Sequence, residues 1–237
     1  MASGSACISP LSTQYHSLGS NGLTRSATNL PITITGYYNR QTKFTGGGSV
    51  VPLWSMANNR ARGGLALVQD FVNTVDLEEG KEQIGTAAAL RSWLVDRGLL
   101  SDRQVTTAEH ARAIQLREAL RRLLFANNGG ELHEVDLDEL NSAARAAGLR
   151  VRFLSEGQTR LEPEATGTAG ALGHIVASVS DAMADRTWFR LKACADERCR
   201  WAFYDQSKNR SGHWCSMEVC GNRSKARQFR RRQRAAS

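Results

Sequence analysis

The sequence lacks any run of eighteen or more apolar residues, the length that a membrane-spanning helix requires. It also lacks the short motifs of common enzyme classes: there is no His-Glu-x-x-His motif, no phosphate-binding glycine loop and no nucleophile elbow. The five histidines are scattered along the chain rather than clustered. These absences argue against a membrane-spanning protein and against an enzyme, and we expect no catalytic residue.

Acidic residues are absent from the first 62 positions, which are rich in Ser, Thr, Gly and Asn. No helical period persists there, and such a segment buries too little apolar surface to offset its chain entropy. We therefore expect residues 1–62 to be a disordered leader, with Cys7 as an unpaired thiol. The leader also resembles an organelle transit peptide, but it lacks a sustained amphipathic helix. The simpler interpretation is an upstream extension, with the true start at Met56.

The other four cysteines form two Cys-x4-Cys pairs that are separated by fifteen residues: Cys194, Cys199, Cys215 and Cys220. Zn2+ prefers a tetrahedron of thiolates in structural sites, and a hairpin across the gap would bring the two pairs together. We therefore predict that these four residues bind one Zn2+. The alternatives are two disulfides, four ordinary buried cysteines, or His213 in place of one thiolate.

The residues around the last cysteine resemble a known family. Cys220-Gly221-Asn222-Arg223, with the upstream cysteines and the arginines that follow, is similar to the CGNR zinc-finger family. Its members usually carry an N-terminal helical region, the ABATE domain, and Asp70-Phe71-Val72-Asn73-Thr74 resembles the start of that domain. The resemblance covers about residues 63–234 and is most specific in the finger. It implies a bacterial, stress-linked transcription regulator.

Positive charge is concentrated near the C-terminus. Residues 186–237 hold 14 Lys/Arg and 4 Asp/Glu, a net +10, whereas residues 1–185 hold 17 and 19, a net −2. A localised basic patch is typical of proteins that bind a polyanion, most often nucleic acid, although a solvated charged tail has the same composition. The residues predicted to contact nucleic acid are Arg223, Lys225, Arg227, Arg230, Arg231, Arg232 and Arg234.

A helix that begins near Asn222 would gather most of these arginines on one broad face, namely Arg223, Arg227, Arg230, Arg231 and Arg234. Ala226 and Phe229 would lie on another face and pack against the finger. Adjacent arginines favour phosphate contacts, which leaves base reading to Arg223 or Arg210. Four cations are expected to offset the negative charge of a zinc tetrathiolate: Lys192, Arg198, Arg200 and Arg223.

Hydrophobic periodicity between residues 63 and 186 predicts a helical domain. The first apolar stripe runs from Leu65 to Val75, and later helices are predicted over residues 86–97, from 101 to about 127, over 136–148 and over 169–184. The inward residues of the third helix are Ala113, Leu116, Leu120 and Leu123, and those of the last are Leu172, Ile175, Val176, Val179 and Met183. Residues 151–161 alternate instead, which predicts a short β-hairpin.

Polar residues at the helix ends predict where each helix starts and stops. Thr86 is the expected N-cap of the second helix. Ser101 with Gln104 would form a capping box for the third helix, and Asp136 with Glu139 would start the fourth. Gly98 and Gly148 suit the left-handed conformation that closes a helix.

The finger is expected to follow the helical region directly. The predicted regions are a leader at 1–62, a helical domain at 63–186 and a zinc finger with a basic C-terminal helix at 187–237. Trp201, Phe203 and Tyr204 alternate like a strand, and the polar segment 205–212 suits a turn. The predicted fold is mainly α with a small β-hairpin, ending in a treble-clef-like zinc finger.

These features together predict a zinc-dependent DNA-binding protein that is cytoplasmic and nucleoid-associated, with double-stranded DNA as its partner. The alternative is an RNA-binding or protein-interaction module, and a homodimer is a candidate assembly. A metalloenzyme is disfavoured, because four thiolates leave no open metal position for water. Asp70, Asn73 and Asp76 either line a small-molecule pocket or form the solvent face of the first helix, which is the favoured interpretation.

Overall fold

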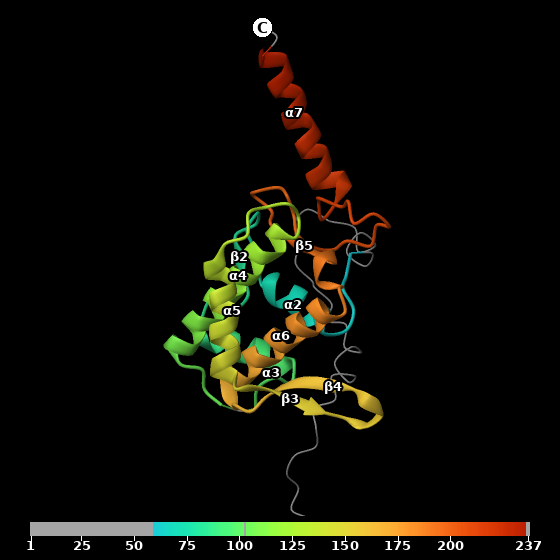
Figure 1. Cartoon of the computed structure of the whole chain (residues 1–237). Coiled ribbons are helices and arrows are strands. Elements are labelled where there is room, and N and C mark those ends of the chain that lie inside the picture. Colours follow the sequence, from blue (N-terminus) through green and yellow to red (C-terminus); the bar gives the residue numbers. More distant parts are fainter. Residues whose placement is uncertain (1–58, 102, 236–237) are drawn as a thin grey trace, which may run out of the picture. The chain divides into compact units, whose positions relative to one another are not determined.

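The computed structural model describes residues 59–101 and 103–235, so most of the predicted leader, including Cys7 and Met56, lies outside the described residues. Within these described residues, the helices before the finger, labelled in Figure 1, are α2 (Gly64–Val72), α3 (Ala87–Asp96), α4 (Thr107–Ala126), α5 (Glu134–Ala147) and α6 (Gly167–Ala184). The finger follows with a short 3-10 turn η3 (Trp188–Arg190), strands β5 (Leu191–Ala193) and β6 (Ala202–Tyr204), a π turn η4 (Met217–Gly221) and helix α7 (Asn222–Ala235). The predicted mainly helical class is confirmed.

The described strands form three antiparallel pairs. One hairpin was predicted for the helical region and another for the gap between the two cysteine pairs, but the finger's pair, β5–β6, lies on either side of the first cysteine pair. The hairpin predicted for the helical region is confirmed as β3 (Leu149–Phe153) and β4 (Thr159–Pro163), joined by the 3-10 turn η2 (Ser155–Gly157). A second pair, β1 (Val75–Asp76) and β2 (Lys81–Glu82), was not predicted. The first helix ends at Val72 and does not reach the predicted Val75, because Val75 pairs with Glu82 in this second strand pair.

The predicted capping box of the third helix is wrong. α4 is capped by Thr106, whose hydroxyl accepts a hydrogen bond from the Glu109 N–H at 3.2 Å, while the Glu109 carboxylate accepts from the Thr106 N–H at 2.8 Å. Both this pair and Ser101 with Gln104 fit the capping-box spacing, but only the former places a negative charge in the first turn, where the helix dipole favours it. The predicted cap of α3 is confirmed, since the Thr86 hydroxyl accepts from the Ala89 N–H at 3.1 Å.

The start of the fourth helix also differs from the prediction. α5 begins at Glu134, and Asp136 lies inside its first turn. The Asp136 side chain is 1% exposed and accepts a hydrogen bond from Nε of Arg122 at 2.7 Å, so it joins α5 to α4 rather than capping α5. The C-terminal end is as predicted, because Gly148 adopts the left-handed conformation at φ 58°.

One hydrophobic core unites the helices and the base of the finger. The predicted inward residues of α4 are all buried, and so are those of α6 except Met183, which is 41% exposed. The same cluster contains Trp188, Leu191, Ala193 and Ala202, which belong to the finger segment. The β5–β6 pair therefore packs as part of the helical core, and no flexible linker separates it from α6. The division at residue 187 stays a prediction.

No helix within residues 59–101 and 103–235 combines the length and the apolar character needed to cross a membrane.

Candidate metal centre and the basic helix that it anchors

The four predicted cysteines converge in space, and their Sγ atoms all lie within 4.8 Å of one another. Sγ of Cys215 is 3.5 Å from Sγ of Cys199 and 3.7 Å from Sγ of Cys220. Four thiolates at about 2.3 Å from a Zn2+ ion would stand about 3.8 Å apart at the corners of a tetrahedron. The spacing fits that ion and excludes a disulfide, whose sulfurs are about 2 Å apart. The cluster is a Zn2+ site, as predicted.

The thiol groups of the cluster influence each other's protonation strongly. Hydrogen bonds from Cys199 and the other sulfurs hold the pKa of the Cys194 thiol far below its ordinary value. The pKa of the Cys215 thiol is raised by its hydrogen bonds with Cys194 and the other sulfurs and by burial. Bound Zn2+ would displace the remaining protons and supply a rigid crosslink between the two cysteine pairs.

A tight turn presents the first pair of cysteines. Cys194 follows β5, and its N–H donates to the carbonyl of Trp201 at 3.0 Å. The N–H groups of Cys199 and Arg200 both donate to the carbonyl of Asp196, at 2.9 and 3.0 Å. This turn places Cys199 beside Cys194 on the same side of the site.

Each residue of the Cys220-Gly221-Asn222-Arg223 motif has a distinct structural role. Cys220 supplies a sulfur from the π turn that precedes α7. A Cβ atom at Gly221 would lie 2.6 Å from Sδ of Met217, so a larger residue would force that side chain to move. The Asn222 amide donates to the carbonyl of Glu218 at 2.9 Å and thereby ties the π turn to α7.

The fourth residue of the motif, Arg223, joins the metal centre to the helical region. Its guanidinium donates to Sγ of Cys220 at 3.4 Å and makes two hydrogen bonds with the Glu78 carboxylate, at 2.6 and 2.8 Å. The pKa of Arg223 is raised by the hydrogen bond with Glu78. Glu78 lies in the β1–β2 turn, which sequence patterns did not single out.

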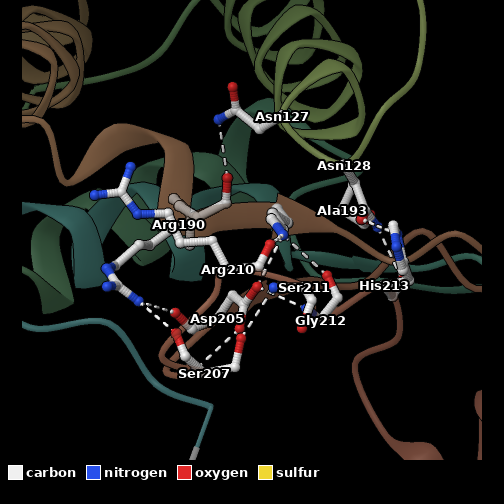
Figure 2. A network of polar contacts seen from close by, with 12 residues as sticks. Asn127, Asn128, Arg190, Ala193, Asp205, Ser207, Arg210, Ser211, Gly212 and His213 are labelled. Carbon is white, nitrogen blue, oxygen red and sulfur yellow. Dashed lines mark hydrogen bonds and ion pairs between the residues drawn. The ribbon is translucent and has the colours of Figure 1, made fainter.

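Two asparagines at the C-terminal end of α4 hold the finger, as Figure 2 shows. The Asn127 amide donates to the carbonyls of Trp188 and Leu191, at 3.1 and 3.0 Å. The Asn128 amide donates to the carbonyls of Ala193 and His213, each at 2.8 Å. Nδ1 of His213 lies 2.9 Å from Oδ1 of Asn128. The metal-ligand cluster consists of the four cysteines without His213, so this histidine does not replace one of the thiolates.

A buried ion pair organises the loop between the two cysteine pairs. Nζ of Lys192 donates to the Asp205 carboxylate at 2.8 Å and to the carbonyls of Arg210 and Gly212, at 2.6 and 3.0 Å. Burial alone would raise the pKa of Asp205, but hydrogen bonds from Lys192 and Ser207 outweigh it and lower that pKa to about 2. Lys192 therefore pairs with Asp205 and does not offset the thiolates as predicted.

Asn73 joins α2 to the finger strand β6. Its side-chain amide accepts from the Ala202 N–H at 2.7 Å and donates to the Ala202 carbonyl at 2.9 Å, and Asn73 is buried. The favoured solvent-face interpretation is therefore wrong for this residue. Asp70 instead pairs with Arg60 at 2.9 Å, and Asp76 accepts backbone hydrogen bonds from its own turn.

Two adjoining parts of the chain match known protein families. Residues 65–186 match the family described as "Putative stress-induced transcription regulator", the ABATE domain, and residues 190–233 match the CGNR zinc finger. The chain belongs to this family. No curated protein matches it. The family is described as one of transcription regulators and not as one of enzymes, and the two matches adjoin where α6 meets the finger.

The basic helix of this ABATE–CGNR protein is α7, as predicted from the arginines after the motif. Seven of its fourteen residues are Arg or Lys, and none of the fourteen is buried. Arg227 donates to the Asp196 carboxylate at 3.3 Å, and Nε of Arg223 lies 3.8 Å from the same carboxylate. Asp196 is 2% exposed, so this buried anion, which sequence reasoning missed, fixes the first two turns of α7 to the metal centre.

The remaining cations predicted to offset the thiolates take different positions. Arg200 donates to the Cys194 carbonyl at 3.3 Å, and its guanidinium lies 3.5 Å from the centre of the Phe125 ring on α4. Arg198 is exposed. Of the four predicted residues only Arg223 donates to a cysteine sulfur in the described part of the chain.

Proposed function

We propose that this protein is a transcription regulator that binds double-stranded DNA through α7, with the Zn2+ site setting the direction of that helix. The observation that carries the proposal is the anchoring of α7. Its first two turns are joined to the metal centre by the preceding Cys220, to the buried Asp196 by Arg227, and to the helical region by Arg223. The rest of the helix is a solvent-exposed row of cations without a single acidic residue.

The cations of α7 divide into two groups. Arg223 and Arg227 have carboxylate partners within the protein, and we assign them to holding the helix in place. The other five make no ion pair within the described residues and are exposed: Lys225, Arg230, Arg231, Arg232 and Arg234. We assign these five to phosphate contacts, because guanidinium and ammonium groups bind phosphate oxygens without needing a base sequence.

The number of free cations sets the salt dependence of binding. Five neutralised phosphates on B-DNA give a slope of log affinity against log salt concentration of about −4.5. Seven contacts would give about −6.3, so the slope distinguishes the two assignments. The helical region would meanwhile keep the finger in one orientation through Asn73, Asn127 and Asn128.

The test is a titration of fluorescent duplex DNA, single-stranded DNA and structured RNA at matched salt concentrations between about 50 and 200 mM. Arg230→Ala should reduce the magnitude of the duplex slope by about 0.9. Arg145→Ala, which removes an exposed arginine from α5, is the matched control and should leave the slope unchanged. A loss shared equally by both variants, or tighter binding to structured RNA than to duplex, would overturn the DNA assignment; the latter result would favour the RNA-binding alternative.

A further inference from the structure

Phe229 is exposed in the middle of the basic helix, although it was predicted to pack against the finger. Its side chain is 63% exposed, and Ala226, one turn before it, is exposed as well. The prediction was wrong because α7 is fixed to the finger through the ion pairs of Arg223 and Arg227 and not through an apolar contact. This aromatic side chain, which lies among arginines, contributes nothing to the core and is accessible to a binding partner.

Helical geometry places Phe229 within an uncharged strip. At about 100° per residue, positions separated by three or four residues lie on the same face. The strip runs through Asn222, Ala226, Phe229 and Gln233, whose spacings are four, three and four. Asn222 is used locally by its bond to Glu218, so the outward apolar part of the strip consists of Ala226 and Phe229.

Cations border this strip on both sides. Arg230 and Arg234 lie along one edge, and Lys225 and Arg232 lie along the other. All four belong to the five free cations of α7. Arg223 and Arg227 share the first edge but turn toward Glu78 and Asp196. The outer turns of α7 therefore present an apolar and amide centre between two positively charged margins.

We propose that the apolar part of this strip, Ala226 and Phe229, contacts base edges in the DNA major groove, which rests on the DNA binding proposed above. The major groove is wide enough to admit a helix, and its walls are the two phosphate backbones. The margins would meet those phosphates while the strip faces the base pairs. Phe and Ala contact the thymine methyl group, so the inference names A·T pairs as the recognised bases. Under this proposal the bases are contacted by the strip and not, as the sequence had suggested, by Arg223.

The experiment selects binding sites from a pool of random duplexes with the full chain carrying Zn2+. The compared proteins are the natural sequence, Phe229→Ala, Phe229→Leu and Gln228→Ala. Gln228 is also exposed and uncharged but lies off the strip, so its variant is the matched control. Affinity for the enriched site, and for the same duplex with uracil replacing thymine, is then measured across salt concentrations. Because no residue of α7 is buried, these changes should leave folding and zinc content intact.

Phe229→Ala should bind the enriched site about tenfold more weakly, within the range for losing one base-pair contact. The salt slope should stay the same, because no cation is removed. Phe229→Leu should recover part of the affinity, and uracil substitution should weaken the natural protein but not Phe229→Ala. An unchanged enriched motif for Phe229→Ala with the salt slope preserved would overturn base reading and leave DNA binding standing. A natural protein that binds no duplex would overturn both proposals.

Discussion

The side-chain amide of Asn73 and the backbone amide of Ala202 form a reciprocal pair of hydrogen bonds, at 2.7 and 2.9 Å, across 129 positions of the sequence. The pair imitates the contact between two neighbouring strands, and it supplies β6 with partners on the side facing α2. From the end of α4, the side-chain amides of Asn127 and Asn128 likewise donate hydrogen bonds to carbonyl groups of β5. The helical region thus holds the finger through amide side chains as well as through the shared core.

Replacing Asn73 with Ala should lower the free energy of unfolding by about 2 to 3 kcal/mol, because it leaves buried polar groups of Ala202 without their partner. Gln69 would still donate to the Ala202 carbonyl at 3.1 Å, which limits the loss. Urea unfolding of the zinc-loaded protein measures the change. Asn141→Ala, at an exposed position on α5, is the control and should stay within about 0.5 kcal/mol of the natural protein. Equal stability of the two variants would contradict the structural role of Asn73.

Removal of Zn2+ should destabilise the whole described region and not the finger alone. Leu191, Ala193 and Ala202 lie in the main core, so unfolding of the finger would open that core. Structural Zn2+ contributes on the order of 10 kcal/mol in finger peptides, which is comparable with the total stability of many domains. Cys199→Ser should abolish the bound Zn2+ measured by elemental analysis, whereas Cys7→Ser should not.

A chelator titration of the natural protein gives the same information without a substitution. Helical content measured by circular dichroism should fall by more than the contribution of α7 as zinc is withdrawn. If the helical region kept its melting temperature after complete zinc removal, the shared core would not couple the two regions.

The Lys192–Asp205 pair should make stability depend on pH in the acidic range. The pKa of Asp205 is about 2 in the folded protein, below its ordinary value of 3.8, so the folded state binds this proton more weakly than the unfolded state does. Asp205 therefore stabilises the fold by about 2 kcal/mol above about pH 4, and this contribution disappears as the pH falls toward 2. The stability difference between the natural protein and Asp205→Asn should shrink over that interval.

The comparison between the two proteins separates this effect from the loss of Zn2+ in acid, because both share the same four cysteines. Glu197→Gln, at an exposed position, provides the control, and its stability difference from the natural protein should not change as the pH falls. If the stability difference between the natural protein and Asp205→Asn stayed constant from pH 5 to pH 2, ionisation of Asp205 would not contribute to the stability of the fold.

Glu78→Ala should release Arg223 and add one cation to the DNA-binding surface. The two side chains are 26% and 44% exposed, so the pair contributes only about 1 kcal/mol or less to stability. The slope of log affinity against log salt concentration should steepen from about −4.5 to about −5.4. Glu79→Ala removes a neighbouring carboxylate that pairs with Lys81 and should leave the slope unchanged. Identical slopes for the two variants would show that Arg223 gains no phosphate contact.

The sequence alone determined the features that depend on local chemistry and short-range period. The paired cysteines predicted the Zn2+ site, because two thiols with four residues between them reach one ion from a single turn. The apolar spacing in residues 107–126 predicted both α4 and its buried face. The arginines after Cys220 predicted a basic helix, because both their spacing and the absence of acidic residues are local properties of the sequence.

Only the tertiary structure decided which polar side chains meet across long distances. An asparagine at position 73 has the same sequence appearance whether it faces water or a strand, and its partner Ala202 carries no polar side chain that could signal the contact. Glu78 and Arg223 are 145 positions apart, and nothing in either neighbourhood marks the other. Phe229 was expected to pack against the finger because it shares a helix face with Ala226, yet ion pairs fix α7 and leave that side chain in solvent. Hydrogen-bond and ion-pair partners depend on the packing of the whole chain, whereas periodicity and ligand spacing act within a few residues.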